Sequence, residues 1–173
     1  MAGKILVILG SARKQSDTEK LLELLLSEVE YTLLDLLDYK LTPYNYKGNY
    51  PTDDAFAEVT AALLQHDVII WATSVYWYAM SGLLKTCFDR FTSLVTINKA
   101  QGWQLAGKLT FLVAVGADAT LPEGFLIPFK NTAAYLNMSF QASFYAATGQ
   151  ITQPQILLAK AEPFIANIVR AKG

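Results

Sequence analysis

The sequence has little of the side-chain chemistry on which hydrolytic and metal sites depend. Its 173 residues include one cysteine and one histidine. An internal disulfide, and a metal cluster held only by cysteines of this chain, are therefore excluded. Hydrolytic triads and histidine-rich metal sites are poor hypotheses, so we expect no metal. We expect Cys87 to be a small buried hydrophobe and His66 to be a structural partner at a helix end.

An excess of charge of one sign is also lacking. Fourteen Lys and Arg against 15 Asp and Glu give a formal net charge of −1, and the sequence contains no polybasic run. This balance gives no electrostatic reason to expect nucleic acid or a membrane surface as a partner. No apolar stretch approaches the length of a membrane span, and we expect the protein to act in the cytoplasm.

Apolar residues, in contrast, are abundant and regularly arranged. They make up 53% of the sequence, which suits one domain over residues 1–173 with a sizeable core. Short apolar runs that suit buried strands alternate with segments of helical periodicity. The runs predict strands at about 5–9, 31–36, 68–72 and 109–115, and a stretch that alternates apolar with polar residues predicts an edge strand at about 138–146. The helical periodicity predicts helices at about 16–29, 52–65, 79–94, 124–136 and 154–170. This alternation predicts an α/β fold, a three-layer, doubly wound, five-stranded parallel sheet. Pro163 predicts a kink or break in the last helix.

The stretch from Gly10 to Thr18 joins the first predicted strand to the first predicted helix. It reads Gly-Ser-Ala-Arg-Lys-Gln-Ser-Asp-Thr. Ser16, with Glu19 three residues later, is a capping box that starts a helix. The start of a helix offers unpaired N–H groups and a partial positive charge, and both attract an anion.

The side chains of this stretch favour a phosphate cradle over an ordinary strand-to-helix turn. The possible donors are Ser11, Arg13, Ser16 and Thr18. Asp17 is an objection, because a carboxylate beside a bound phosphate repels it unless the side chain points away. The glycines of a Rossmann fingerprint or a Walker loop are absent.

Two further loops are expected to meet this stretch. Ligands of doubly wound sheets bind outside the carboxyl ends of the strands, which here are the loops after residues 9, 72 and 115. The second loop is aromatic and contains Ser74, Val75, Tyr76, Trp77 and Tyr78; the third is small and contains Gly116, Ala117 and Asp118. Three adjacent aromatic residues cannot all face one way, so we expect at least one of them to contact a ligand or a partner.

The most specific pattern is Val75-Tyr76-Trp77-Tyr78-Ala79-Met80-Ser81-Gly82, followed by Lys85 and Asp89-Arg90. Together with the stretch from Gly10 to Thr18, it resembles the flavodoxin-like NAD(P)H-dependent FMN reductases, a flavodoxin-fold oxidoreductase family. That family usually has proline where Ser74 stands. The resemblance runs from residue 4 to about 118 and implies a flavodoxin-like sheet with strand order 2-1-3-4-5.

The resemblance implies FMN as the cofactor and NADPH or NADH as the co-substrate. The FMN phosphate would lie on Ser11, Arg13, Ser16 and Thr18, in the loop that also holds Asp17; the ring would lie against Val75, Tyr76 and Trp77, between Ser74 and Tyr78; and the loop from Gly116 through Ala117 to Asp118 would lie near the pyrimidine edge. The implied activity is hydride transfer from NAD(P)H through flavin N5 to a small-molecule acceptor. A quinone, an azo or nitro compound, or free flavin would fit, and no side-chain acid or base is demanded.

Two other functions stay open. The first is a flavodoxin-type electron carrier that does not use NAD(P)H, which Arg13 and the near-neutral charge argue against. The second is a flavin-free binding protein on the same fold, which the departures at Asp17, Ser74 and Ala117 keep possible. The resemblance also implies a homodimer that pairs through the helix at about 79–94. Its candidate contacts are Phe88, Phe91 and Leu94.

Residues 38–51 break the pattern and predict a long ordered loop rich in tyrosine. Iron–sulfur relatives of the family carry closely spaced cysteines in this region, where this sequence has Tyr44, Tyr46 and Tyr50. No cluster can form there without thiolates. The tyrosines either wall the mouth of the active site or fill a subunit contact, and the sequence favours neither.

Overall fold

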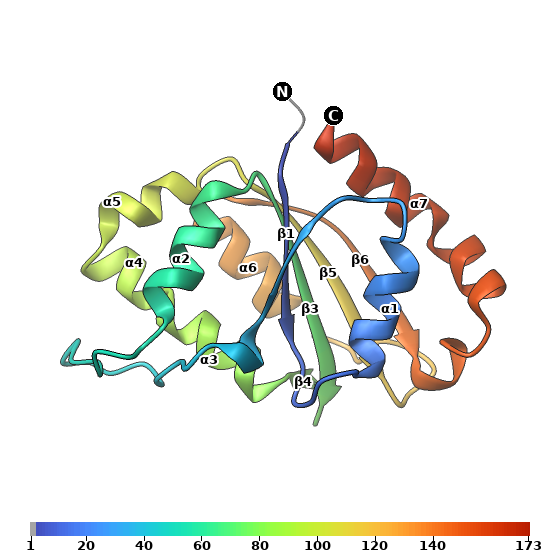
Figure 1. Cartoon of the computed structure of the whole chain (residues 1–173), viewed down its shortest axis with the longest axis horizontal. Helices are drawn as coiled ribbons and strands as arrows, with labels where there is room; N and C mark the ends of the chain where they lie inside the picture. Colours follow the sequence, from blue (N-terminus) through green and yellow to red (C-terminus); the bar gives the residue numbers. More distant parts are fainter. Residues whose placement is uncertain (1–2) are drawn as a thin grey trace.

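A parallel sheet between two layers of helices organises the computed structural model, which describes residues 3–173 (Figure 1). Its parallel strands are β1 (Ile5–Gly10), β2 (Thr32–Asp35), β3 (Val68–Tyr76), β5 (Leu109–Gly116) and β6 (Ser139–Ala147). They lie in the order β2-β1-β3-β5-β6. Numbered among themselves along the chain, these strands have the order 2-1-3-4-5, so the predicted fold class and strand order are confirmed.

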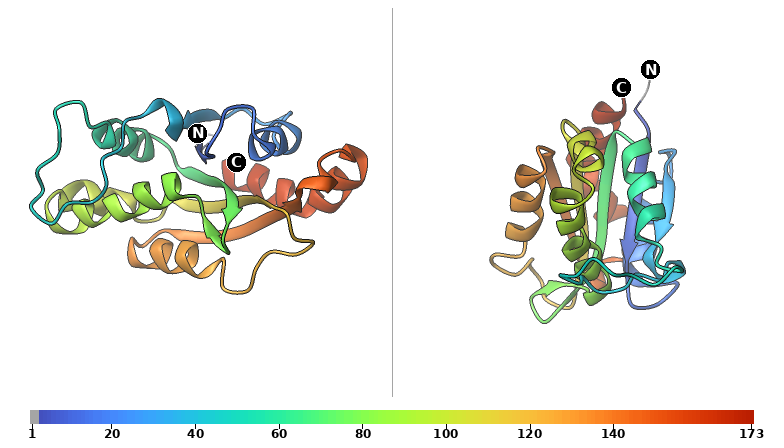
Figure 2. Two further views of the ribbon diagram at one scale, coloured as in Figure 1. Left: turned by 90° about the horizontal axis from the view of Figure 1, so that it is seen from below. Right: turned by 90° about the vertical axis from the view of Figure 1, so that its left-hand side faces the viewer.

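The helices lie on both faces of the sheet. One side carries α1 (Asp17–Leu25) and α7 (Pro154–Lys172). The other side carries α2 (Phe56–Gln65), α3 (Gly82–Arg90), α4 (Thr92–Thr96), α5 (Lys99–Gly102) and α6 (Ile127–Tyr135), as Figures 1 and 2 show. Among the helices of residues 3–173, none is long and apolar enough to cross a membrane.

Strand β1 shows why the sheet needs both layers. Its side chains alternate between the two faces, because successive residues of a strand point in opposite directions. Leu6 and Ile8 join the apolar cluster under α2 to α6, whereas Val7 and Leu9 join the cluster under α1 and α7. The two faces of β1 are therefore both buried, as its continuous apolar run predicted.

The aromatic segment after the third predicted strand is not a loop. Strand β3 continues to Tyr76 and turns back into the short strand β4 (Ala79–Met80), with which it pairs antiparallel. Helix α3 then begins at Gly82 rather than at 79, because the Ser81 hydroxyl accepts the N–H of Leu84 and caps the helix there. The segment predicted as one helix to residue 94 is divided into α3 and α4.

Four other helix predictions need correction. Helix α1 ends at Leu25 rather than near 29. Helix α2 begins at Phe56 rather than near 52, where a carboxylate oxygen of Asp54 accepts the Phe56 N–H. Helix α6 begins at Ile127 rather than at 124, with a proline in its first turn, where the missing N–H costs nothing. Helix α7 runs without a break through Pro163, and buried Phe164 and Ile168 continue its core-facing side beyond the proline.

The two isolated reactive side chains have structural roles. Cys87 is fully buried, and burial raises the pKa of its thiol to about 12. His66 Nδ1 lies 2.7 Å from the Ala62 carbonyl oxygen in the last turn of α2, as expected of a partner at a helix end. The candidate dimer contacts Phe88, Phe91 and Leu94 are all buried in the core of the chain itself, although Phe88 and Phe91 also line a groove between α4 and α6.

Candidate functional site

The stretch after β1 forms the predicted helix start. Ser16 has extended backbone angles, and its hydroxyl accepts the N–H of Glu19 at 3.2 Å, so it caps α1. The remaining N–H groups of the first turn face the end of the sheet at which β1 stops, where they can bind an anion.

A cavity of about 220 Å³ lies at this edge, at the carboxyl ends of the central strands. All three predicted loops contribute to it. Its lining residues are Ser11, Arg13, Ser16 and Asp17 from the first loop, Ser74, Val75 and Tyr76 from the second, and Val115, Gly116, Ala117 and Thr148. The left view of Figure 2 is taken from this side, with the hairpin of β3 and β4 near its centre.

The residues that line the cavity and the site residues predicted from the sequence do not coincide. Two lining residues were not predicted, and four predicted residues do not line the cavity. The predicted edge strand is confirmed as β6, which runs parallel to β5 and ends at the same edge of the sheet. Thr148, which follows it, was missed because only the loops after residues 9, 72 and 115 were expected at the site. Val115 also lines the cavity, although the sequence predicts it only as a strand residue. The predicted residues that do not line the cavity are Thr18, Trp77, Tyr78 and Asp118.

Ser11 gives the clearest sign that this cavity takes a ligand. Ser11 is 1% exposed, and its Oγ has no hydrogen-bond partner among residues 3–173. Burying a hydroxyl without a partner is costly, and most such groups in folded proteins have one. A bound group with oxygen acceptors would satisfy Ser11, so the residues present fit an anion such as a phosphate.

The objection raised by Asp17 is weakened by its neighbours. One carboxylate oxygen accepts from the Lys20 ammonium at 3.2 Å, and the other lies 3.8 Å from the Arg13 guanidinium. These two cations offset the charge of Asp17 beside the cavity, although both pairs are partly exposed and therefore weak.

Thr18 lies behind the cavity rather than in its wall. It is fully buried, and its hydroxyl is 3.0 Å from the hydroxyl of Ser74. This hydrogen bond joins the first turn of α1 to β3. Thr18 therefore fixes the position of Ser74 instead of pointing into the cavity.

The tip of the hairpin between β3 and β4 consists of two aromatic residues with positive φ. Trp77 has φ 46° and Tyr78 has φ 65°, and both side chains are exposed. A two-residue turn with positive φ at both positions usually takes Asn or Gly, and bulky residues there are strained. Such strain is concentrated at functional sites, and this tip stands beside Tyr76 at the cavity.

Tyr145 of β6 holds the third loop. Its hydroxyl donates to the Asp118 carbonyl oxygen at 2.6 Å. A Cβ atom on Gly116 would lie 2.7 Å from that hydroxyl, so only glycine allows this approach. Burial and the charge of Asp118 raise the pKa of the Tyr145 phenol, so the group stays protonated and able to donate at neutral pH.

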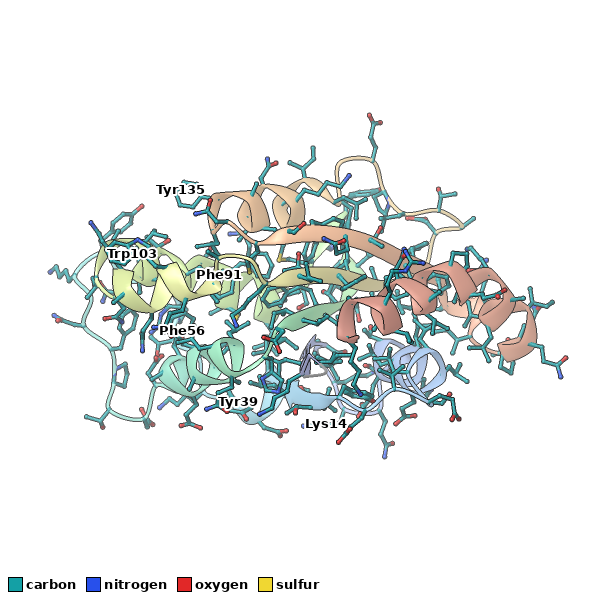
Figure 3. All side chains as sticks on the ribbon, turned by 90° about the horizontal axis from the view of Figure 1, so that it is seen from above. Lys14, Tyr39, Phe56, Phe91, Trp103 and Tyr135 are labelled. Atoms are coloured by element: carbon teal, nitrogen blue, oxygen red, sulfur yellow. The ribbon has the colours of Figure 1, made fainter. Side chains whose placement is uncertain are left out.

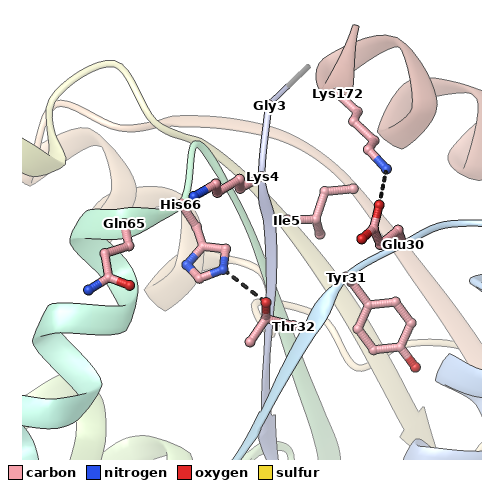
Figure 4. Close-up of a pocket in the computed structure, with 9 residues that line it drawn as sticks. All are labelled: Gly3, Lys4, Ile5, Glu30, Tyr31, Thr32, Gln65, His66 and Lys172. Atoms are coloured by element: carbon pink, nitrogen blue, oxygen red, sulfur yellow. Dashed lines mark hydrogen bonds and ion pairs between the residues drawn. The ribbon is translucent and has the colours of Figure 1, made fainter. Parts of the chain in front are cut away.

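A larger cavity of about 530 Å³ lies at the opposite end of the sheet. Lys4, Thr32 and His66 line it, together with the pair formed by Lys172 and Glu30 (Figure 4). Ligands of doubly wound sheets bind at the carboxyl ends of the strands, and this cavity is at the amino end of β1. His66 is also already paired there with the Thr32 hydroxyl at 3.1 Å.

Comparisons with known proteins agree with the site at the carboxyl ends. The family model described as NADPH-dependent FMN reductase matches residues 3–153. YwqN of Bacillus subtilis (strain 168), named as an NAD(P)H-dependent FMN-containing oxidoreductase, is 27% identical over 147 residues, which cover 80% of this chain and 81% of that protein.

Solved structures show the same fold. The Trp repressor binding protein of Bacillus subtilis has a TM-score of 0.72 at 26% identity, covering 91% of this chain and 96% of that one. General stress protein 14 of Treponema denticola, solved in complex with FMN, has a TM-score of 0.67 at 21% identity, covering 98% of this chain and 99% of that one. The resemblance read from the sequence is thus confirmed, and the chain belongs to the NADPH-dependent FMN reductase family.

Proposed function

We propose that this chain is an FMN-dependent oxidoreductase that takes a hydride from NADPH or NADH and passes the electrons to a quinone, an azo or nitro compound, or free flavin. One observation carries the proposal. The unpartnered, buried Ser11 hydroxyl lies where three loops meet at the carboxyl ends of the strands, beside the capped start of α1. Membership of the family supplies the identity of the anion, the FMN phosphate.

We assign the phosphate to the first loop. Ser11 would donate its free hydroxyl, the first turn of α1 after Ser16 would donate N–H groups, and the exposed Arg13 would add a charged donor. Thr18 contributes by holding Ser74, through the hydrogen bond between their hydroxyls. This bond offers a reason why the loop tolerates serine where the family usually has proline.

The remaining assigned residues would surround the flavin ring. Val75 and Tyr76 would pack against it from the second loop, and Gly116 to Asp118 would face its polar edge. When bound, FMN supplies the hydride chemistry. The protein therefore needs to position the flavin, shield it from water and stack against the substrate, and it needs no side chain that acts as an acid or base. The exposed rings of Trp77 and Tyr78 stand beside this cavity and would stack on a planar substrate.

The test is to add FMN to the purified protein, remove free FMN by gel filtration, and titrate anaerobically with NADPH and then NADH. We expect bound flavin whose visible absorption bleaches with at least one nicotinamide and returns when a quinone is added. Bound flavin that ignores both nicotinamides would instead support an electron carrier. Absence of retained flavin would support a flavin-free binding protein.

Tyr145→Phe is expected to weaken FMN binding about two- to tenfold, the value of one ordinary hydrogen bond. The change frees the loop of Gly116 to Asp118 from its hydrogen bond to β6. Fluorescence titration with FMN would measure the effect. Tyr31→Phe is the matched control, since Tyr31 lines the cavity at the opposite end of the sheet. Equal affinities of the two variants would contradict the role assigned to Tyr145.

We also propose that residues 1–173 act as one flavodoxin-like FMN-binding domain, in the cytoplasm, and as a homodimer. A groove between α4 and α6, lined by Val95 and Tyr135, supports an interface on this side of the molecule. Tyr135 and nearby Trp103 are exposed large aromatic residues (Figure 3). Sedimentation that showed a monomer at micromolar concentration would refute the dimer.

A further inference from the structure

A second polar cavity lies away from the proposed flavin site, under the loop of residues 39–55, which we call the tyrosine loop. It measures about 220 Å³, enough for several waters or one small molecule. It shares no lining residue with the proposed flavin site. We call it the loop cavity, and it is lined by Gly48, Tyr50, Pro51, Asp54, Phe56, Ala57, Thr60, Arg90, Ser93, Ile97, Asn98 and Gln101.

Three buried polar atoms of residues that line the loop cavity have no hydrogen-bond partner in the part of the chain that the structure describes. They are Oγ1 of Thr60, Nε of Arg90 and Oγ of Ser93. The three residues are 1%, 3% and 4% exposed, respectively. They come from α2, α3 and α4, so three separate elements each contribute a residue with an unsatisfied group to the lining of one cavity. Groups of this kind are rare in folded proteins and point to a bound partner.

The charge in the wall is already balanced. Two nitrogens of the Arg90 guanidinium donate to the two carboxylate oxygens of Asp54, at 2.7 and 2.9 Å. The same carboxylate accepts the N–H groups of Thr42 and Phe56, so its oxygens are fully used. An anion would be repelled by Asp54 and a cation by Arg90. A hydrocarbon would leave the three polar atoms unpaired.

We propose that the loop cavity binds a small neutral molecule that carries a carboxamide group. A carboxamide oxygen has two lone pairs, which suit the Nε–H of Arg90 and one hydroxyl, and its NH₂ group can donate to the other hydroxyl. The amides of Asn98 and Gln101 stand at the rim, where they can recognise further polar atoms. The ligand thus satisfies all three unpartnered atoms without adding charge.

An occupant of the loop cavity would also brace the tyrosine loop. Gly48, Tyr50 and Pro51 of that loop form one wall, and residues of α2, α3, α4 and α5 form the others. Gly48 has φ 69°, and a Cβ atom there would lie 3.1 Å from the Ile97 side chain, so the loop approaches α4 closely. The Tyr50 ring is stacked on Arg90, 3.5 Å from the guanidinium carbon to the ring centroid. A ligand on Arg90 therefore lies against the base of this loop.

The experiment is a titration of the folded protein with acetamide, followed by NMR at the side-chain Nε–H of Arg90. We expect a saturable shift of this resonance. Thr60→Val and Ser93→Ala should each weaken acetamide binding about three- to tenfold, the effect of losing one hydrogen bond. Thr110→Val is the matched control, because Thr110 is a buried threonine of β5 that does not line the loop cavity.

Acetate, the anion of similar shape, should bind more weakly than acetamide. Equal binding of the two would overturn the proposal that the ligand of the loop cavity is neutral. Absence of a saturable shift, as expected if only water fills the cavity, would overturn the site itself. Affinity unchanged in both Thr60→Val and Ser93→Ala would show that acetamide binds elsewhere. FMN binding and nicotinamide oxidation do not enter these measurements, so the loop cavity is tested independently of the proposed function.

Discussion

Replacing Asp54 with alanine is expected to lower the free energy of unfolding by about 3–5 kcal/mol, the cost of leaving a buried charge unpaired. The Arg90 and Asp54 side chains are 4% and 6% exposed. The guanidinium carbon lies 3.5 Å from the centroid of the Tyr50 ring and 4.5 Å from that of the Phe56 ring, so both rings hold Arg90 in the core. The variant also frees the N–H of Thr42, which Asp54 accepts at the start of the tyrosine loop.

Urea denaturation with linear extrapolation would measure the change. Asp89→Ala is the matched control, because Asp89 forms a pair with Lys85 on the exposed face of α3. Removing an exposed partner is expected to cost less than about 1 kcal/mol. If Asp54→Ala were no more destabilising than Asp89→Ala, the buried pair would not anchor the loop as described.

The same pair gives the protein a defined sensitivity to acid. Burial alone would raise the pKa of Asp54, but hydrogen bonds from Arg90, Thr42 and Phe56 outweigh it and lower the pKa from 3.8 to about 2. Because the folded-state pKa is the lower one, this stabilisation is complete above pH 4 and is lost as the pH falls toward 2. The difference corresponds to roughly 2 kcal/mol. In an Asp54→Asn variant, the free energy of unfolding should lack this decrease between pH 4 and pH 2.

The sequence could not reveal this pair, although it contained both of its residues. Asp53 and Asp54 are neighbours with the same local signals, yet Asp53 lies on the surface with Lys40, whereas Asp54 is buried with Arg90. The choice depends on a contact between residues 36 positions apart. Periodicity and capping report only on neighbours within a turn or a strand, so they predict the start of a helix and not its distant partner.

The same limit to local signals explains which other features could be predicted from the sequence and which could not. The β1 run and the Ser16 cap are local, and both were correct, although the Glu19 side chain does not complete the predicted capping box, since its Oε2 has no hydrogen-bond partner among residues 3–173. The confirmed strand order depended on the family resemblance rather than on periodicity. The hairpin at Trp77 and Tyr78 was missed, because neither residue type favours positive φ and the pairing with β4 stabilises the turn from outside. Tyr145 was missed because its hydrogen bond spans 27 residues, although the small Gly116 opposite it was noticed.

Replacing Ser11 with alanine is expected to weaken FMN binding about ten- to a hundredfold, the value of one hydrogen bond to a charged group. The stability of the variant should stay unchanged or rise slightly, since the substitution removes a buried hydroxyl that has no partner among the described residues. If Ser11 had only a structural role, Ser11→Ala would lower the free energy of unfolding and the affinity for FMN together. Affinity for FMN by fluorescence and unfolding by urea would separate the two cases.

Ser11→Asp should have a larger effect, with FMN affinity reduced more than about a thousandfold, because it places a carboxylate where the phosphate would bind. Ser27→Asp is the control for the added charge, since Ser27 is exposed just beyond α1. A folded Ser11→Asp variant that bound FMN as well as Ser27→Asp would remove the phosphate from the first loop. Loss of affinity confined to the Ser11 variants, at unchanged stability of Ser11→Ala, would instead tie the unpartnered hydroxyl to the ligand, because no contact within the chain could produce that combination.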